Sequence, residues 1–245
     1  MDVTRIAELL QPFLAAPSAD SIKADHAEES AVLSPDQLNC ISIYIDLLLR
    51  WNARINLTAI RQPEDIVTRH FGESLFAARH LFPAKTKWRQ PESAPSEIEG
   101  AVQSGRSWVP SLIDVGSGAG FPGLPIKIWN PNINLTLIES NQKKATFLRE
   151  VIRNLTLTDI NVFSARAEDF PNPPSEVVTL RAVERFDTTL PIAATLVAPG
   201  GRLALLISEA QLARTKDLTP GFAWTSPLRI PLSSSRILTI GVRES

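Results

Sequence analysis

The chain has 245 residues, 44% of them hydrophobic and 21% charged, which is the composition of a globular protein with a sizeable core. Its formal net charge of −1 excludes a general electrostatic attraction to nucleic acid, so such a partner would have to be held by local basic patches. The single cysteine, Cys40, excludes an internal disulfide and argues against a thiol-rich metal site. We therefore expect a cytoplasmic protein without a metal centre, a membrane span or a secretory signal.

The N-terminal third, residues 1–82, is predicted to be helical. Residues 3–14 carry apolar side chains at helical spacing. Residues 34–37, Ser-Pro-Asp-Gln, form a strong helix start with a capping box and a proline in the first turn. A long amphipathic helix follows. Pro63 begins another helix, whose apolar side carries His70.

The rest of the chain changes character twice. Residues 83–110 are rich in proline, serine, glycine and charge, and predict a flexible linker or insertion. In residues 111–245, short apolar runs alternate with amphipathic ones, which predicts an α/β domain with a parallel sheet covered by helices on both faces. The expected strands are residues 111–115, 133–139, 160–165, 176–180, 202–208 and 236–244. The expected helices are residues 122–130, 141–155 and 188–198, the last ended by Gly200 and Gly201.

The segment "LIDVGSGAGFPGLPIKI" places a glycine-rich loop between the first strand of this domain and the helix that follows. In an open α/β sheet this point lies at the carboxyl edge of the strands, where ligands bind. Gly116, Gly118 and Gly120 can adopt positive φ and let backbone N–H groups approach a ligand without an intervening Cβ. A ligand-binding loop is therefore favoured over a bare strand-to-helix turn.

Two registers of this loop predict different ligands. Gly118, Gly120 and Gly123 match the dinucleotide fingerprint G-x-G-x-x-G, with Glu139 about 20 residues further on, but this register leaves Asp114 without a role. The second register, Asp-x-Gly-x-Gly-x-Gly, places Asp114 at the strand tip and is the first motif of S-adenosylmethionine-dependent methyltransferases. An acid near the loop would repel a diphosphate, whereas it can attract an ammonium or sulfonium group.

Further charged residues follow the later strands. Glu139 ends the second strand and is expected to hold the hydroxyls of a ribose. Glu168 follows the third strand, where it can accept a hydrogen bond from an adenine amino group or simply begin a helix. The fourth strand leads into Arg181 and Arg185. No general base stands out, and a guanine N7 acceptor needs none, because it carries a lone pair and no proton.

Taken together, the motifs resemble those of the small-subunit ribosomal RNA guanine-N7 methyltransferases, the RsmG or GidB family. The resemblance rests on "LLLRWNARINLTAIRQPEDIVTRHFGESL", on the loop with its "GFPG" portion, and on "LIESNQKKATFLREV", "ARAED" and "LRAV" in this order. It covers residues 33–207 apart from the linker. It implies a Rossmann-like class I methyltransferase fold with an N-terminal helical extension and S-adenosylmethionine as cofactor. The implied acceptor is N7 of a guanine in 16S rRNA, within the small ribosomal subunit or its precursor.

The resemblance also implies residues of the cofactor site. Many members carry aspartate where this chain has Glu139 and Glu73. The family's cofactor contacts fall on Gly116, Phe121, Ala167, Glu168 and Arg181. The loop register and the strand ends add Asp114, Gly118, Gly120 and Glu139.

A third group of residues is expected to serve the RNA. The candidates for positioning the RNA or supporting the cofactor loop are Asn56, Arg69, His70 and Arg181. The candidates for RNA contact are Lys143, Lys144, Arg149, Arg153 and Arg185. Basic residues at helical spacing also suit a solvated helix face, and His70, on an apolar side, also suits a packed, hydrogen-bonded role.

Two other functions stay open at this level. The shifted glycine register suits an NAD-type nucleotide-dependent oxidoreductase. The lack of an identifiable general base suits a non-catalytic RNA-binding factor in ribosome assembly, which would keep the cofactor pocket only as a scaffold.

Overall fold

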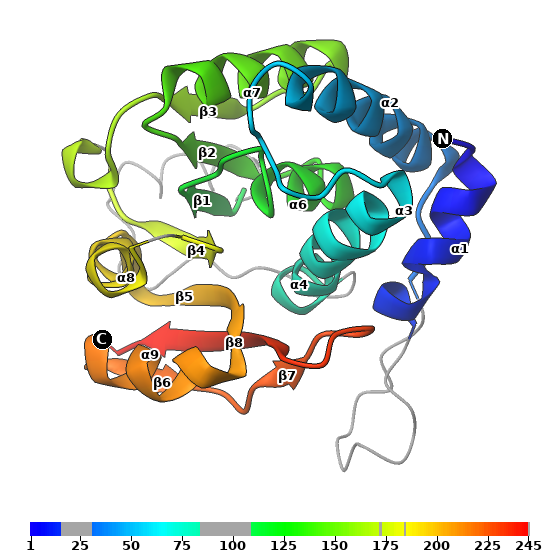
Figure 1. Cartoon of the computed structure of the whole chain (residues 1–245). Helices are drawn as coiled ribbons and strands as arrows, with labels where there is room; N and C mark the ends of the chain where they lie inside the picture. The colour runs from blue at the N-terminus through cyan, green and yellow to red at the C-terminus, as the bar shows by residue number, and fades with distance from the viewer. Residues whose placement is uncertain (16–30, 84–108, 172, 184, 245) are drawn as a thin grey trace, which may run out of the picture.

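The computed structural model describes residues 1–15, 31–83, 109–171, 173–183 and 185–244, so most of the predicted linker over 83–110 lies outside the described residues. The described chain forms one eight-stranded sheet with the strand order β3-β2-β1-β4-β5-β8-β6, in which β7 also pairs with β8 (Figure 1). The strands are β1 Ser111–Val115, β2 Asn134–Ile138, β3 Ile160–Phe163, β4 Ser175–Arg181, β5 Val197–Ser208, β6 Phe222–Trp224, β7 Leu228–Arg229 and β8 Arg236–Arg243.

The first five strands are parallel, as the alternation of strands and helices predicts. The last strand differs, because β8 runs antiparallel to β5, from Arg202 opposite Val242 to Ser208 opposite Arg236. The chain reaches β8 through β6 and β7, two short strands that the sequence did not reveal. The expected parallel sheet is thus confirmed for β1 to β5, and the sheet is mixed because its last strand runs in the opposite direction.

The junction before β5 also differs from the prediction. The helix α8, Phe186–Thr195, ends earlier than expected, and β5 begins at Val197 rather than at Arg202. Val197 is fully buried and pairs with Ser175, and the register then shifts before Arg202 pairs with Val177. Gly200, with φ +71°, lies in the irregular segment between these two pairs and allows the chain to make this bulge.

The predicted capping box forms at the start of α2, Pro35–Asn52. The Ser34 hydroxyl accepts from the Gln37 amide at 3.2 Å, and the Gln37 side chain accepts from the Ser34 amide at 2.8 Å. The same Gln37 side chain donates to the carbonyl of Ile128 at 2.8 Å, so this cap also ties α2 to the helix after the glycine loop. The remaining helices of the sheet domain are α6 Gly123–Trp129, α7 Gln142–Asn154 and α9 Leu212–Leu218.

The helix predicted to begin at Pro63 has a widened turn in its middle. Residues Pro63–Ile66 (α3) and Glu73–Leu81 (α4) are α-helical, and Val67–Gly72 between them form a π-helical turn. Such turns occur often at functional sites. A Cβ on Gly72 would come within 2.7 Å of the ring of Phe13, so glycine allows α1, Val3–Leu14, to pack closely here.

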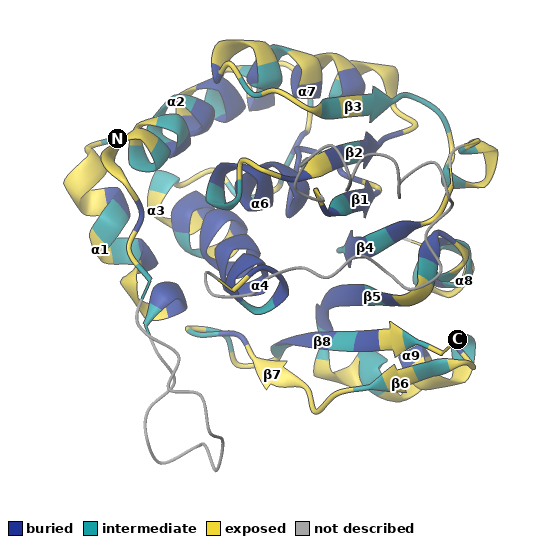
Figure 2. Cartoon of the chain, turned by 180° about the vertical axis from the view of Figure 1, so that it is seen from behind, coloured by how far each residue is buried: buried dark blue, intermediate teal, exposed yellow. Residues whose placement is uncertain are grey.

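Helices cover both faces of the sheet, as expected, and successive strand residues point to opposite sides. Leu112, Val177 and Ala204 join one buried cluster with residues of α1, α2, α4, α6 and α7. Ile113 and Val178 join a second cluster, with α8 and α9 packed over it. The N-terminal helices thus share a continuous core with the sheet (Figure 2).

Candidate cofactor and substrate site

The glycine loop follows β1 directly, and the end of this strand distinguishes the two possible registers of the loop. β1 ends at Val115, so Asp114 belongs to the strand and Gly116 begins the loop. The dinucleotide register would require the strand to continue through Gly116 and Ser117. Gly116, Gly118 and Gly120 all have positive φ, +70°, +58° and +90°. The loop therefore has the Asp-x-Gly-x-Gly-x-Gly register.

The glycines of this loop face different surroundings. A Cβ on Gly120 would lie 2.6 Å from Leu124, and one on Gly123 would lie 2.7 Å from Leu137 and 2.9 Å from a carboxylate oxygen of Asp114. These two glycines are required by the packing of the protein itself. A Cβ on Gly118 would meet nothing closer than 3.8 Å. Gly118 therefore faces open space, as a residue that approaches a ligand must.

Asp114 lies beneath this loop, fully buried. One carboxylate oxygen accepts from the Thr179 hydroxyl at 2.8 Å, and the other accepts from the Gly123 amide, the first amide of α6, at 3.2 Å. Burial raises the pKa of Asp114 to about 6 against the opposing effect of these hydrogen bonds. Because Asp114 uses the first amide of this helix, that amide is not available to a diphosphate. A direct contact from Asp114 to an ammonium group stays a prediction.

Glu139 comes directly after β2 and reaches the loop. One of its carboxylate oxygens accepts from the Gly118 amide at 2.8 Å, and the other accepts from the Asn141 amide at 2.8 Å. Each oxygen keeps a second lone pair for a hydroxyl donor. The structure thus brings Glu139 and Gly118 together, and a contact from Glu139 to a ribose stays a prediction.

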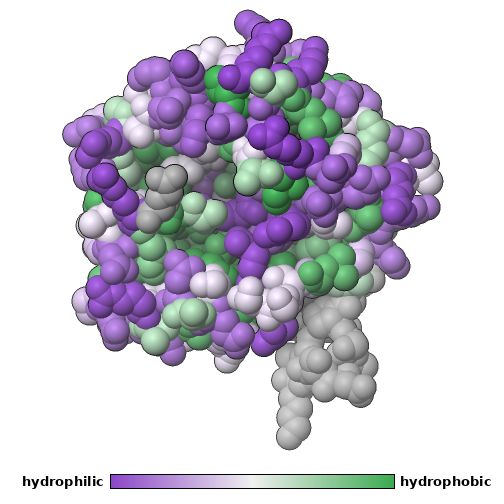
Figure 3. Space-filling view, viewed as in Figure 1, coloured by the Kyte–Doolittle hydropathy of each residue, from purple (hydrophilic) through white to green (hydrophobic). Residues whose placement is uncertain are grey.

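The residues predicted after β3 and β4 lie at the same edge of the parallel strands. Ala167 and Glu168 begin a short 3₁₀ turn, with Glu168 exposed. Arg185 is exposed directly before α8. From the side of Figure 1, the molecular surface is hollowed near its centre, where hydrophobic side chains come to the surface between hydrophilic ones (Figure 3).

Phe121, in the loop, is held by aromatic side chains from the N-terminal helices. The ring of Tyr44 stacks on it at a centroid distance of 5.3 Å and that of His70 at 4.7 Å, while Phe71 meets its ring edge-on at 5.1 Å. The Tyr44 hydroxyl donates to the carbonyl of Ala119. Sequence reasoning missed Tyr44, because a buried tyrosine on the apolar side of a helix gives no signal of the loop that it contacts.

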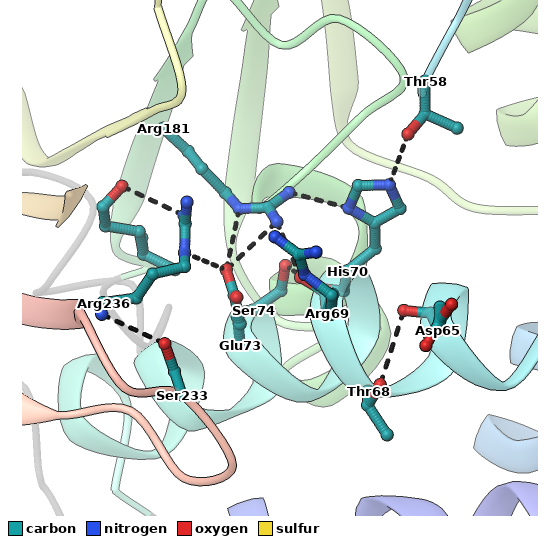
Figure 4. A network of polar contacts seen from close by, with 11 residues as sticks. Thr58, Asp65, Thr68, Arg69, His70, Glu73, Ser74, Arg181, Ser233 and Arg236 are labelled. Carbon is teal, nitrogen blue, oxygen red and sulfur yellow. Dashed lines mark hydrogen bonds and ion pairs between the residues drawn. The ribbon is translucent and has the colours of Figure 1, made fainter. Parts of the chain in front are cut away.

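Arg181, at the end of β4, is buried in a polar network on the π-helical turn (Figure 4). Its guanidinium pairs with Glu73 at 3.1 Å and contacts Nδ1 of His70 at 3.1 Å. It also donates to the carbonyl of Arg69 at 2.6 Å. Glu73 pairs in addition with Arg236 at 3.0 Å, a residue that no sequence motif connects with this site.

The positioning candidates are thus brought together with one exception. Arg69, His70 and Arg181 form a single cluster, whereas Asn56 is exposed. The asparagine that holds this segment in place is Asn52. Its side-chain oxygen accepts from the Leu57 amide at 2.9 Å and from the Thr58 amide at 3.0 Å.

His70 is held as a neutral ring. Burial, followed by the charges of Arg181, Arg69 and Arg236, lowers its pKa to about 3. Because Arg181 can only donate, Nδ1 accepts from it, and Nε2 then carries the proton toward the Thr58 hydroxyl at 2.8 Å. Both ring nitrogens are engaged, so His70 is a structural partner of Arg181 rather than a free base.

The low pKa of His70 predicts how stability depends on pH. The native state binds fewer protons than the unfolded state, in which the pKa is near 6.5. The free energy of unfolding that is linked to His70 is therefore at its highest above pH 6.5, and it falls as the pH is lowered toward 3. Urea unfolding from pH 7 to pH 4 should show a smaller loss for His70→Gln than for the unchanged protein. An equal pH dependence in the two proteins would contradict a neutral, buried His70.

Four of the five RNA-contact candidates lie on α7, and the fifth, Arg185, lies directly before α8. Lys143, Arg149 and Arg153 are exposed and Lys144 is partly buried. Arg149 donates to the carbonyl of Val162 at 3.3 Å and to the Ser164 hydroxyl at 3.1 Å, across the edge strand β3. Arg149 and Arg153 line a shallow groove there.

The described residues were also predicted to contain neither a metal centre nor a membrane span. Among the described residues, no group of three or more histidine, cysteine, aspartate or glutamate side chains is arranged to hold a metal ion. Within the same parts of the chain, no helix combines the length and the apolar character needed to cross a membrane.

The chain is similar in sequence to known proteins of one family. The family model described as GidB, rRNA small subunit methyltransferase G, matches residues 37–88 and 98–223. A relative named "Ribosomal RNA small subunit methyltransferase G" from Xanthomonas campestris pv. campestris (strain B100) is 33% identical over 203 residues, which are 80% of this chain and 82% of that protein.

Relatives of the same name from Desulfitobacterium hafniense and Chloroflexus aggregans are 38% and 40% identical over 73% and 70% of this chain. The matches cover 66% and 64% of those proteins, so this chain spans just under two thirds of their length.

A solved structure shows the same fold. The magnesium protoporphyrin IX methyltransferase from Synechocystis PCC 6803, solved with bound SAM, superimposes with a TM-score of 0.55 at 14% identity and covers 84% of this chain and 97% of its own. The strand order found here, with its antiparallel β8, is that of the class I methyltransferases. On the family model and these relatives together, the chain belongs to the GidB family, the rRNA small subunit methyltransferases G.

Proposed function

We propose that this protein transfers a methyl group from S-adenosylmethionine to N7 of a guanine in 16S rRNA, within the small ribosomal subunit or its precursor. The observation that carries the proposal is the glycine loop of a GidB family member, in which Gly118 faces open space and donates its amide to Glu139 at 2.8 Å. The proposed location is the cytoplasm, where such an RNA is found.

The residues at the strand ends suit this cofactor. S-adenosylmethionine supplies a methyl group on a positively charged sulfur, which is electrophilic without further activation. Glu139 offers one remaining lone pair on each oxygen to a pair of ribose hydroxyls. The Gly118 position gives the cofactor room, and the Phe121 ring, fixed by Tyr44 and His70, limits how far the loop can move.

The protonation states near the loop suit an acceptor without a proton. His70 is neutral but has both nitrogens engaged, and Asp114 is buried under the loop with its oxygens bonded to Thr179 and Gly123. Neither side chain is free to remove a proton from a substrate. N7 of guanine carries a lone pair in the plane of the ring and needs no base, so alignment supplies most of the rate.

The test is methyl transfer by the purified protein. It is incubated with unmodified small-subunit ribosomal RNA and methyl-labelled S-adenosylmethionine, and the product is mapped by cleavage specific for N7-methylguanine. We expect label at one guanine of the RNA. Binding of the cofactor and the RNA without transfer would instead support an assembly factor. NADH binding without affinity for S-adenosylmethionine would support an oxidoreductase.

A further inference from the structure

A second pocket lies beside the Arg181 network, on the far side of Glu73. It has a volume of about 290 Å³ and lies between the π-helical turn and the loop that joins β7 to β8. Thr68 and Arg69 line it from the turn, Glu73 from the start of α4 and Phe13 from α1. Residues 231–235 of the loop and Arg236 at the start of β8 line the other side. None of the functions above assigns a ligand to this pocket.

The charges around this pocket are not balanced. Arg181 and Arg236 share the single carboxylate of Glu73, at 3.1 Å and 3.0 Å. Arg69 is exposed, and within the described residues its guanidinium makes no ion pair. Arg69 and Arg236 thus line the pocket and Arg181 pairs with Glu73 beside it, while Glu73 is the one carboxylate among the described lining residues. Such an excess of positive charge favours an anion.

The loop contributes hydroxyl groups as possible donors. Residues 233–235 are three consecutive serines, and Ser234 and Ser235 are exposed. The Ser233 hydroxyl accepts from the Arg236 amide at 3.0 Å, which leaves its proton free to be donated. Serine hydroxyls and guanidinium groups together are typical donors to phosphate oxygens.

The loop is held in place rather than loose. The Glu209 amide donates to the carbonyl of Ser235 at 2.8 Å, and the Arg229 guanidinium donates to that of Ser234 at 2.8 Å. Leu232, next to the serines, is 74% exposed and has φ +58°, an unfavourable conformation for a leucine. Strained residues of this kind concentrate at ligand sites.

Arg236 joins this pocket to the end of β4. It also lines a small cavity together with Ala182 and Val183, the residues directly after Arg181. Ala182 has φ +49°, a second strained position at this edge. An anion held by Arg69 and Arg236 would therefore lie next to the sheet edge where the cofactor loop opens.

We propose that this pocket, formed by Arg69, Arg236 and Ser233–Ser235, binds a backbone phosphate of the RNA substrate close to the nucleotide that receives the methyl group. The inference rests on the proposed function for the identity of the RNA. The planar guanidinium group can hold two phosphate oxygens at once, and such contacts fix the register of an RNA without reading its sequence.

The test measures RNA binding directly. A labelled, unmodified fragment of small-subunit ribosomal RNA is titrated in the presence of adenosylhomocysteine at several salt concentrations. Arg69→Gln is expected to raise the Kd for the RNA about tenfold and to lower the salt slope by about one. Ser234→Asp, which puts a negative charge on an exposed position of the loop, should weaken binding at least as much. The affinity for adenosylhomocysteine should not change.

Arg214→Gln is the matched control. Arg214 is exposed on α9 and pairs with Asp187 at 3.0 Å, so its replacement removes the same charge away from the pocket. We expect its RNA affinity and salt slope to equal those of the unchanged protein. Weakening by all three substitutions alike would show a general charge effect and overturn the inference.

Further outcomes separate the pocket from the proposed function. Arg69-dependent RNA binding without methyl transfer by the unchanged protein would support the pocket and reject the function. If the unchanged protein transfers the methyl group and both pocket variants bind the RNA normally, the proposed function is supported and the pocket is rejected. Binding to anionic phospholipid vesicles and to inorganic phosphate is measured as well. If Arg69→Gln loses either of these while it binds the RNA normally, the pocket serves another anion and the inference is wrong.

Discussion

Gly118→Val is expected to weaken S-adenosylmethionine binding about 100-fold or more, which corresponds to about 2.7 kcal/mol. A Cβ at this position meets no protein atom within 3.8 Å, so the valine side chain would occupy the open space in front of the loop. The residue also has φ +58°, which a β-branched side chain adopts poorly. Isothermal calorimetry with S-adenosylmethionine measures the loss.

Gly200→Val separates loss of the ligand site from backbone strain. Gly200 has φ +71°, and a Cβ there would meet no atom within 4 Å, but the residue lies in the bulge before the regular part of β5. Both variants should lose a similar free energy of unfolding, about 1–2 kcal/mol, because both force a valine into the left-handed region. Only Gly118→Val should lose the cofactor. Equal cofactor affinity in the two variants would remove Gly118 from the site.

Glu73→Gln is expected to lower the free energy of unfolding by about 3–5 kcal/mol. The Glu73 side chain is 4% exposed and pairs with Arg181 and Arg236, whose side chains are 9% and 21% exposed. Without its negative charge, two largely buried guanidinium groups would face each other with no carboxylate between them. Burial already lowers the pKa of Arg181, and Glu73 opposes that shift. Urea unfolding monitored by tryptophan fluorescence measures the change.

The matched control for this substitution is Glu209→Gln. Glu209 pairs with Arg229 at 3.2 Å, but both side chains are more than half exposed. Loss of an exposed pair changes the free energy of unfolding by no more than about 1 kcal/mol. A similar, small effect of both substitutions would mean that the charge of Glu73 does not hold the network together.

The local parts of this site could be predicted from the sequence. An apolar run that ends in Asp114 and is followed by three alternate glycines has few structural solutions, and the register was confirmed by the end of β1 at Val115. Glu139 could be placed as well, because parallel strands bring their carboxyl ends to one edge. These inferences depend only on neighbouring residues and on the rules of parallel sheets.

The contacts between distant segments could not be predicted. Tyr44 reaches the loop from α2, and Arg236 reaches Glu73 from the far end of the chain. Neither residue differs in its sequence surroundings from an ordinary core tyrosine or a strand-end arginine. The antiparallel β8 was missed for a related reason, since strand direction depends on how the chain returns and not on the pattern of the strand itself.

The bond from Tyr44 to the carbonyl of Ala119 has a consequence for the autonomy of the sheet region. The helix that carries Tyr44 precedes β1 in the chain, and its aromatic ring forms one wall of the loop around Phe121. A fragment that starts at residue 109 would lack Tyr44, so the Phe121 ring would lose a stacking partner and the Ala119 carbonyl would lose its hydrogen-bond donor. We therefore expect the Rossmann-like half to depend on these helices for an ordered loop. Recombination with the helices of a relative should preserve cofactor affinity only where the replacement supplies an equivalent ring.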